Sequence, residues 1–209
     1  MAKIKTRDRI LDTSLALFNA LGEPNVTTLL ISDELDISPG NLYYHFNNKS
    51  DIVSELFEGF ELQMHDLLAV PADASISLDQ QNFFLHLLFE AVAHYRFLYQ
   101  DLVNVLSRHP RLQPKFRKIL KLKNNAFHTI CTSFSAQGFM TIGTEELATL
   151  CDQLTLTTCY WSSFDTLSHL DDRNAVDPGR GVYQTMSLML PYLAPEEKEQ
   201  ALLISRSYL

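Results

Sequence analysis

The sequence lacks the features that mark several large classes of protein. No apolar run reaches the length of about 18 residues that a membrane-spanning helix needs, and the opening residues do not read as a signal peptide. Cysteine is scarce, and Cys131, Cys151 and Cys159 lie far apart without a metal-binding spacing such as Cys-x-x-Cys. We therefore expect free thiols in a cytoplasmic protein, with neither a membrane helix nor a structural zinc site.

A surplus of positive charge is also missing. The formal net charge is −8 and the pI is about 5.3, which argues against non-specific nucleic-acid binding driven by bulk charge. A local contact surface is still compatible with this balance, because Lys49 is the only formal charge between residues 37 and 50. The first ten residues are locally basic as well, with four cations and one acid: Lys3, Lys5, Arg7, Arg9 and Asp8.

Catalytic signatures are absent too. No Ser/His/Asp set, carboxylate pair or glycine-rich phosphate loop occurs in a context that indicates catalysis, so we expect neither an enzyme nor a bound cofactor. Internal repeats, low-complexity tracts and strand-like alternation are not found either. The 209 residues, 46% of them apolar, are enough for a small head on a larger body.

Helical periodicity and helix-ending residues predict an all-α fold. Gly22, Gly138 and the Asp177-Pro178-Gly179 segment are among the residues that punctuate the pattern. The pattern leaves open whether residues 78–108 form one helix or two. The expected helices cover residues 5–21, 26–35, 39–46, 49–70, 78–95, 96–108, 114–137, 145–169, 181–193 and 195–207.

The stretch from Ser38 to Phe46 has the pattern of a short helix that reads DNA. Ser38 is suited to cap the first amides and Pro39 to the first helical position. At about 100° per residue, Leu42 and Phe46 share one face, which we expect to be buried. The opposite face carries a glycine, an amide and phenols, which suit close approach to DNA, base reading and phosphate contact. Its residues are Gly40, Asn41, Tyr43 and Tyr44.

A second short helix precedes this one. Thr27 is placed to cap it, and Leu30, Ile31 and Leu35 have the spacing of an inward face. Asp36 and Ile37 follow as a tight turn. A helix, a tight turn and a second helix with a polar outer face constitute a helix-turn-helix motif.

On the basis of these residues, the first sixty residues resemble the DNA-binding domain of the TetR/AcrR family of bacterial transcriptional regulators. Two positions depart from the family pattern: Ser32 stands where Ala is usual, and Asp36 stands where Gly is usual. Asp tolerates a left-handed backbone, so the turn is retained. The matching signature comprises residues 27–31, Ile37, Ser38, Gly40, residues 42–46 and Lys49.

The resemblance implies a ligand-responsive regulator, which we expect to be a repressor that binds a palindromic operator as a homodimer. It implies an N-terminal DNA-binding domain (1–48), a connecting helix (49–70) and an effector-binding and dimerisation domain (71–209). One short helix reads few base pairs, so a two-fold dimer with half-sites about 34 Å apart, or a multiple of that, is the physical solution. The alternative is an all-α small-molecule-binding or enzyme-like protein whose head no longer binds DNA.

The expected DNA contacts follow from the helix faces and the family motif. Three residues are expected to face bases: Gly40, Asn41 and Tyr44. Six residues are expected to contact phosphates: Lys5, Thr28, Ser38, Tyr43, His45 and Lys49.

The body is expected to hold a small-molecule effector, because the resembled family has a mostly apolar pocket there. Most aromatic side chains at helical spacing are simply core residues, but some are expected to line such a pocket. The candidates are Phe89, Tyr99, Phe127, Phe134 and Trp161. The apolar helices at residues 145–169 and 181–193 are expected to pair with a second copy as a four-helix bundle.

Two polar clusters have an ordinary and a functional interpretation. One helical face carries His86, Glu90 and His94. The favoured interpretation is three partly exposed polar residues, and the alternative is a set of metal ligands. No acid occurs between residues 102 and 144, so the cations there are expected to form a solvated basic face, with an anion site as the alternative. The cations are Arg108, Arg111, Lys115, Arg117, Lys118, Lys121 and Lys123.

The helix expected at residues 49–70 is the mechanical link in this interpretation. It leaves the head and enters the body without a proline or a loop, so a shift near residues 62–68 would tilt the head. Gly59 lies inside it, where glycine costs up to about 1 kcal/mol relative to alanine. Either close packing against a neighbouring helix or a local point of bending explains this glycine.

Overall fold

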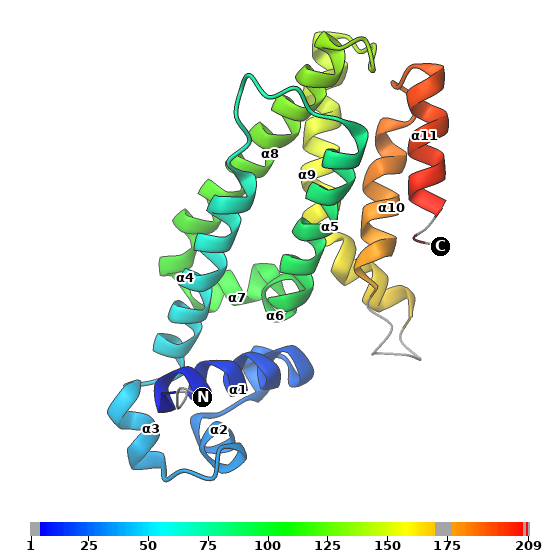
Figure 1. Cartoon of the computed structure of the whole chain (residues 1–209). Helices are drawn as coiled ribbons and strands as arrows, with labels where there is room; N and C mark the ends of the chain where they lie inside the picture. Colours follow the sequence, from blue (N-terminus) through cyan, green and yellow to red (C-terminus); the bar gives the residue numbers. More distant parts are fainter. Residues whose placement is uncertain (1–4, 170–176, 207, 209) are drawn as a thin grey trace. The chain divides into compact units, whose positions relative to one another are not determined.

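The computed structural model describes residues 5–169, 177–206 and 208 (Figure 1). These residues form helices without regular strands, and one isolated antiparallel bridge joins Met140 to Leu193. No helix in this part of the chain is long and apolar enough to cross a membrane. The elements are α1 (Thr6–Leu21), η1 (Glu23–Asn25), α2 (Thr28–Glu34), α3 (Pro39–His45), α4 (Lys49–Leu68), α5 (Leu78–His94), α6 (Arg96–Gln100), α7 (Leu102–Arg108), η2 (Pro110–Leu112), α8 (Gln113–Ala136), α9 (Thr144–Ser168), α10 (Pro178–Met189) and α11 (Pro195–Arg206). The expected all-α class is confirmed.

The helices gather into two compact units. The N-terminal unit comprises residues 1–62 and 95–115, and the C-terminal unit comprises residues 63–94 and 116–209. This division differs from the ranges expected from the sequence, because residues 95–115 join the head and α4 contributes residues to both units.

Contacts between α1 and α6 explain why residues 95–115 belong to the N-terminal unit. The rings of Phe18 and Phe97 lie 5.4 Å apart between their centroids, and both side chains are buried. Asn19 Oδ1 accepts a hydrogen bond of 2.9 Å from the amide of Phe97. Arg96 donates a hydrogen bond of 2.7 Å to the carbonyl of Asn19. These contacts join segments that are far apart in the sequence and that local patterns do not pair.

The segment at residues 78–108 forms three helices, where the sequence left one or two open. Tyr95 (φ −103°, ψ 40°) separates α5 from α6, and Asp101 (φ −137°, ψ 40°) separates α6 from α7. Both residues leave the helical region without proline or glycine, so the usual sequence signals of a break are missing.

Gly59 lies where α4 faces Tyr95 in the N-terminal unit. A Cβ atom at Gly59 would lie 3.0 Å from the Tyr95 hydroxyl oxygen. This distance supports close packing as the reason for the glycine. Whether α4 also bends at this residue stays a prediction.

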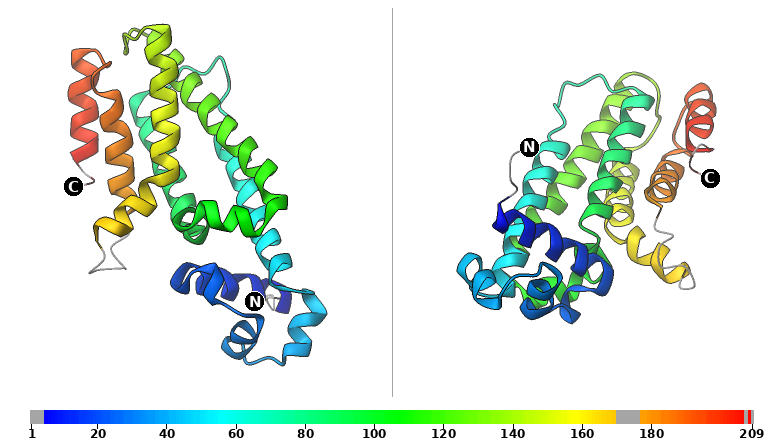
Figure 2. Two further views of the ribbon diagram at one scale, coloured as in Figure 1. Left: turned by 180° about the vertical axis from the view of Figure 1, so that it is seen from behind. Right: turned by 60° about the horizontal axis from the view of Figure 1, so that its bottom comes forward.

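In the C-terminal unit, α10 packs against α5 and α9, and α11 lies beside α10 (Figure 2). A Cβ atom at Gly181 would lie 2.4 Å from the ring of Phe89, so the glycine allows α10 to approach α5. α10 begins earlier than expected, at Pro178, because the Asp177 side chain accepts a hydrogen bond of 2.8 Å from the amide of Gly179. The expected end of the last helix at Ser207 lies outside the described residues.

The cations between residues 108 and 123 do not form the single solvated face that the sequence predicted. Carboxylates from other parts of the chain pair with two of them: Arg108 contacts Glu23, and Lys115 contacts Glu61 at 3.0 Å. Lys123 is fully buried and donates to the carbonyl of Thr158 at 3.2 Å. Burial lowers the pKa of Lys123. The expectation was wrong for Lys123, because burial by distant parts of the chain is invisible to a local charge pattern.

The cysteines are free thiols, as the sequence predicted. Cys131, Cys151 and Cys159 are free and buried in the C-terminal unit. They form no disulfide with one another, as expected from their spacing.

Candidate nucleic-acid interface

Side-chain caps and one left-handed residue shape the turn between α2 and α3. Thr27 Oγ1 accepts a hydrogen bond of 3.1 Å from the amide of Leu30, and Ser38 Oγ accepts one of 3.2 Å from the amide of Asn41. Asp36 has a φ of 53°, the left-handed conformation expected for this turn. Ser32 is buried, and its hydroxyl donates to the carbonyl of Thr28 at 2.9 Å. The two departures from the family pattern therefore both fit the motif.

The faces of α3 are arranged as the sequence predicted. Leu42 is 0% and Phe46 3% exposed, so both belong to the core of the N-terminal unit. Tyr44 is 85% exposed and Tyr43 49% exposed on the outer side. Gly40 and Asn41 are exposed with them, and Asn41 supplies an amide that can read a base edge.

A shallow hollow of about 300 Å³ lies beside this outer face. Two of its residues are tied together, because the hydroxyls of Thr28 and Tyr43 lie 2.9 Å apart in a hydrogen bond. Three residues expected to contact phosphate, Thr28, Tyr43 and Lys49, thus line one hollow. The described lining contains no acid: it consists of Pro24, Val26, Thr27, Thr28, Tyr43, Asn47, Asn48 and Lys49.

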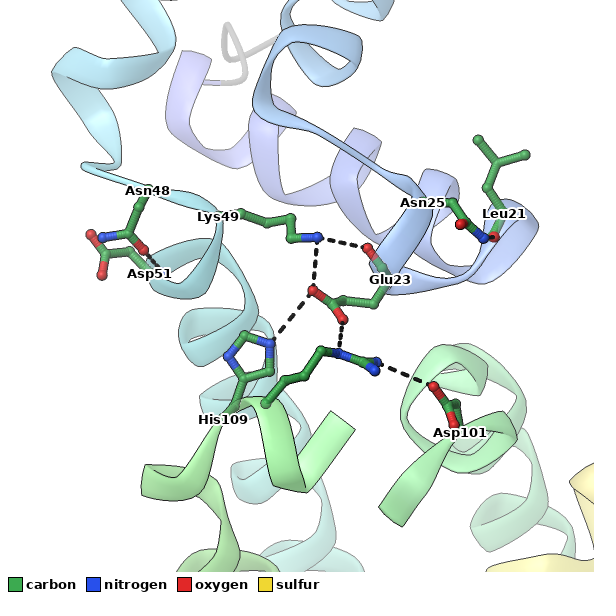
Figure 3. Close-up of polar contacts among 9 residues, drawn as sticks. Leu21, Glu23, Asn25, Asn48, Lys49, Asp51, Asp101 and His109 are labelled. Carbon is green, nitrogen blue, oxygen red and sulfur yellow. Dashed lines mark hydrogen bonds and ion pairs between the residues drawn. The ribbon is translucent and has the colours of Figure 1, made fainter. Parts of the chain in front are cut away.

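Lys49 has a carboxylate partner that the sequence did not indicate (Figure 3). Its Nζ lies 2.9 Å from Glu23 Oε1 and donates a second hydrogen bond of 2.9 Å to the carbonyl of Glu23. The Glu23 side chain is 2% exposed, whereas that of Lys49 is 27% exposed. The ammonium group therefore rests on a buried anion, and Lys49 also lines the hollow.

Two residues from the end of α7 complete the Glu23 cluster, which we define as Glu23, Lys49, Arg108 and His109. Arg108 Nε donates to Glu23 Oε2 at 2.9 Å, and its guanidinium also contacts Asp101 at 3.2 Å. His109 Nε2 lies 3.5 Å from Glu23 Oε1, the oxygen that Lys49 also contacts (Figure 3). One carboxylate thus joins η1, the first residue of α4 and the end of α7.

The surroundings of Glu23 keep its carboxylate charged. Burial by itself raises the pKa of Glu23, but the nearby His109, the hydrogen bond from Lys49 and the charges of Lys49 and Arg108 outweigh it. Together they lower the pKa from 4.5 to about 2. The cluster consequently contains an ionised carboxylate throughout the physiological pH range.

The basic residues near the start of the chain are partly used within the N-terminal unit. Arg7 forms an ion pair with Glu55 and lies 4.8 Å from the ring centroid of Phe46. Arg9 donates to the carbonyl of Leu35 at 3.4 Å. Lys5 is exposed just before α1, and Lys3 lies outside the described residues.

The five aromatic residues proposed for an effector pocket do not gather in one unit. Tyr99 is buried in the N-terminal unit, where its ring lies 5.8 Å from that of Phe60. The other four lie in the C-terminal unit: Phe89, Phe127, Phe134 and Trp161. Their place in a pocket stays a prediction.

Cavities in the C-terminal unit have other linings. One of about 650 Å³ is lined by Gln63, Asp66, Leu67, Leu87 and Glu90. Another of about 240 Å³ includes Phe84 and Ile130, and is otherwise lined mostly by residues 69–81.

The histidine cluster on α5 does not form a metal site in the described part of the chain. His86 Nε2 lies 3.2 Å from Glu90 Oε1 as an i, i+4 pair. Among the residues described, no group of three or more His, Cys, Asp or Glu is placed to hold a metal ion.

Two short helices are joined by a tight turn, in which Asp36 has a left-handed backbone. The second helix presents an exposed amide and exposed phenols. This arrangement defines the class of helix-turn-helix proteins. The model for the tetR family of bacterial regulatory proteins matches residues 10–56, and the TetR model for bacterial transcriptional repressors matches residues 59–201. The chain belongs to the TetR family of bacterial transcriptional regulators.

Individual relatives agree with this membership. A TetR-family transcriptional regulator from Marinobacter aquaeolei VT8 is 36% identical, with a TM-score of 0.88 over 98% of this chain and 99% of that one. The biofilm operon negative regulator IcaR of Staphylococcus epidermidis is 28% identical over 58% of this chain, and the match spans 65% of IcaR. The ketosteroid regulator KstR2 of Mycobacterium tuberculosis shares the fold, with a TM-score of 0.64 and 18% identity over 92% of this chain and 97% of that one.

Proposed function

We propose that this protein binds a palindromic operator as a homodimer and represses transcription, with DNA affinity modulated by a small molecule in the C-terminal unit. The observation that carries the proposal is the outer surface of α2 and α3. It presents Asn41 and Tyr44 outward and gathers Thr28, Tyr43 and Lys49 around an acid-free hollow. The alternative of a head that no longer binds DNA is disfavoured by the same surface, which keeps every expected polar group.

The contacts divide into two kinds in this proposal. Gly40 lets the backbone approach the groove, and Asn41 and Tyr44 face base edges. The hollow receives a backbone phosphate, which Thr28, Tyr43 and Lys49 contact from separate elements. Lys5, Ser38 and His45 supply further phosphate contacts around this centre.

A stripe on α9 supports the homodimer. Four large apolar residues spaced by four, four and three positions are exposed there, so they share one helical face. Large exposed apolar surfaces are typical of interaction sites. Residues in the interior of the C-terminal unit, such as Leu150, Leu154 and Met186, are already buried and are not available to a partner. The stripe comprises Leu156 (59% exposed), Tyr160 (44%), Phe164 (58%) and Leu167 (67%).

We propose that the effector binds in the C-terminal unit. Its cavities of about 650 and 240 Å³ provide space, with apolar surface from Leu87 in the larger one and from Phe84 and Ile130 in the smaller one. An effector changes DNA affinity only if it binds the DNA-competent and DNA-incompetent dimers differently. Because α4 contributes residues to both units, movement of its C-terminal part is the proposed route of coupling.

A gel shift with the promoter of the protein's own gene tests the proposal. Two protomers are expected to bind one site, in preference to a scrambled duplex of equal length, with affinity that falls as salt is raised. Equal affinity for the promoter and the scrambled duplex would contradict operator recognition. The same assay with candidate effectors separates ligands that release DNA from ligands that do not.

A further inference from the structure

We propose that Glu23 is a positioning residue for DNA binding, which holds the Lys49 ammonium beside the hollow so that it meets a backbone phosphate. The inference rests on the proposed function, because it concerns how the same surface binds DNA. Glu23 itself is 2% exposed and does not line the hollow, so it acts through Lys49.

The hydrogen-bond geometry of Lys49 is the first support. A lysine ammonium has three donors, and two of them go to Glu23 Oε1 and to the Glu23 carbonyl, each at 2.9 Å. The third donor remains for a ligand, since the side chain is 27% exposed and Lys49 lines the hollow. A free lysine side chain loses rotamer entropy when it binds phosphate. Lys49 loses less, because its ammonium is already held by Oε1 and by the carbonyl oxygen of Glu23.

The position of Lys49 also needs explanation because it begins α4. A cation is disfavoured at a helix N-terminus by the helix dipole. The Glu23 carboxylate offsets this effect, since it lies within ion-pair distance of the ammonium. The carboxylate therefore retains the positive charge beside the hollow instead of leaving it to turn away into solvent.

The remaining members of the cluster fix Glu23. Arg108 holds Oε2 at 2.9 Å, while Lys49 and His109 contact Oε1, so both carboxylate oxygens are engaged. Arg108 is held in turn by Asp101. The end of α7 thus sets the orientation of a carboxylate that positions a lysine on α4. Within the N-terminal unit, Arg108 is expected to influence DNA binding without touching DNA.

A double-mutant cycle on operator affinity tests the proposal. Glu23→Gln keeps the size of the side chain but removes its charge, and it is expected to weaken operator binding about fivefold when Lys49 is present. Lys49→Ala alone is expected to weaken binding about tenfold, the order of one charge-assisted hydrogen bond. In the Lys49→Ala background, Glu23→Gln is expected to change affinity less than about twofold, because its effect passes through Lys49. Circular dichroism and thermal melting confirm first that each variant is folded.

Equal weakening by Glu23→Gln in both backgrounds would overturn the positioning role and leave a structural one. Tighter binding by Glu23→Gln would overturn it too, since Glu23 would then compete with phosphate for Lys49. If the wild-type protein does not prefer its operator at all, the proposed function fails instead, so the two failures are distinguishable.

A second pair of variants keeps the test available if Glu23→Gln does not fold. Arg108→Gln and Arg111→Gln each remove one positive charge, but only Arg108 contacts Glu23, whereas Arg111 is exposed on η2. Arg108→Gln is expected to weaken operator binding about twofold to threefold, and Arg111→Gln to leave it unchanged. Equal effects of the two variants would show a general charge effect and contradict the proposal.

Discussion

At the scale of single residues, the charge of Glu23 links stability to pH. Its pKa is lowered from 4.5 to about 2, so the folded state favours the ionised carboxylate. A lowered folded-state pKa contributes stability that is complete above the unfolded-state pKa. That contribution is lost as the pH falls from about 4.5 toward 2. The size of the shift corresponds to roughly 3 kcal/mol.

Urea unfolding of the wild-type protein and Glu23→Gln at pH 7 and pH 3 measures this contribution. At pH 7 the wild type is expected to be more stable than Glu23→Gln by a few kcal/mol, because the variant leaves Lys49 and Arg108 without their anion. Most of the difference is expected to disappear at the lower pH. A difference that stays constant between the two pH values would show that the carboxylate charge is not the stabilising feature.

The same residues show what a sequence can and cannot predict. Thr27, Ser38 and Asp36 were predicted because caps and turns depend on neighbours in the chain. The Glu23 cluster was not, because Glu23 and Arg108 are 85 positions apart and neither stands in a distinctive motif. The acid-free tract from residue 102 onward was the nearest signal, but its charge pattern predicted a solvated basic face and not a buried partner.

At the scale of elements, the starts of α2 and α3 were predicted closely, whereas the division of residues 78–108 was not. Capping residues and helical periodicity indicate starts, but Tyr95 and Asp101 interrupt a stretch of ordinary helix-forming residues. These breaks accompany packing within the N-terminal unit, as the contacts of Asn19 with Arg96 and Phe97 show. Tertiary contacts override local propensity at such points.

Gly59 on α4 gives a prediction at this scale. Alanine has a helix propensity up to about 1 kcal/mol better than glycine, but its Cβ would meet the Tyr95 hydroxyl at 3.0 Å. Gly59→Ala alone is therefore expected either to leave the melting temperature unchanged or to lower it. In a Tyr95→Phe background, which lacks the hydroxyl, Gly59→Ala is expected to raise it. The same effect in both backgrounds would show that Tyr95 does not limit this position.

The bending role of Gly59 is measured separately, as the change in operator affinity at saturating effector. A weaker change in Gly59→Ala, with effector affinity retained, is the result expected if α4 bends at this residue. Normal coupling would exclude bending at Gly59 while leaving α4 as the connecting element.

At the scale of the whole molecule, the exposed stripe on α9 predicts the assembly state. Phe164→Glu places a charge in the proposed interface and is expected to weaken dimerisation at least about a hundredfold. Leu203→Glu on α11 is the matched control, because Leu203 is 63% exposed and Phe164 is 58% exposed. Analytical ultracentrifugation at micromolar concentration is expected to show a dimer for the wild type and Leu203→Glu, and a monomer for Phe164→Glu. A monomeric wild type would contradict the homodimer.

The salt dependence of DNA binding tests the central claim most directly, measured by fluorescence anisotropy on an operator duplex and a scrambled duplex. Lys49→Ala is expected to weaken binding to both duplexes alike and to reduce the slope of log affinity against log salt by about one unit, since one phosphate contact is lost. Asn41→Ala is expected to reduce the preference for the operator while leaving that slope unchanged. An unchanged slope in Lys49→Ala, or a wild type without preference for the operator, would contradict the account.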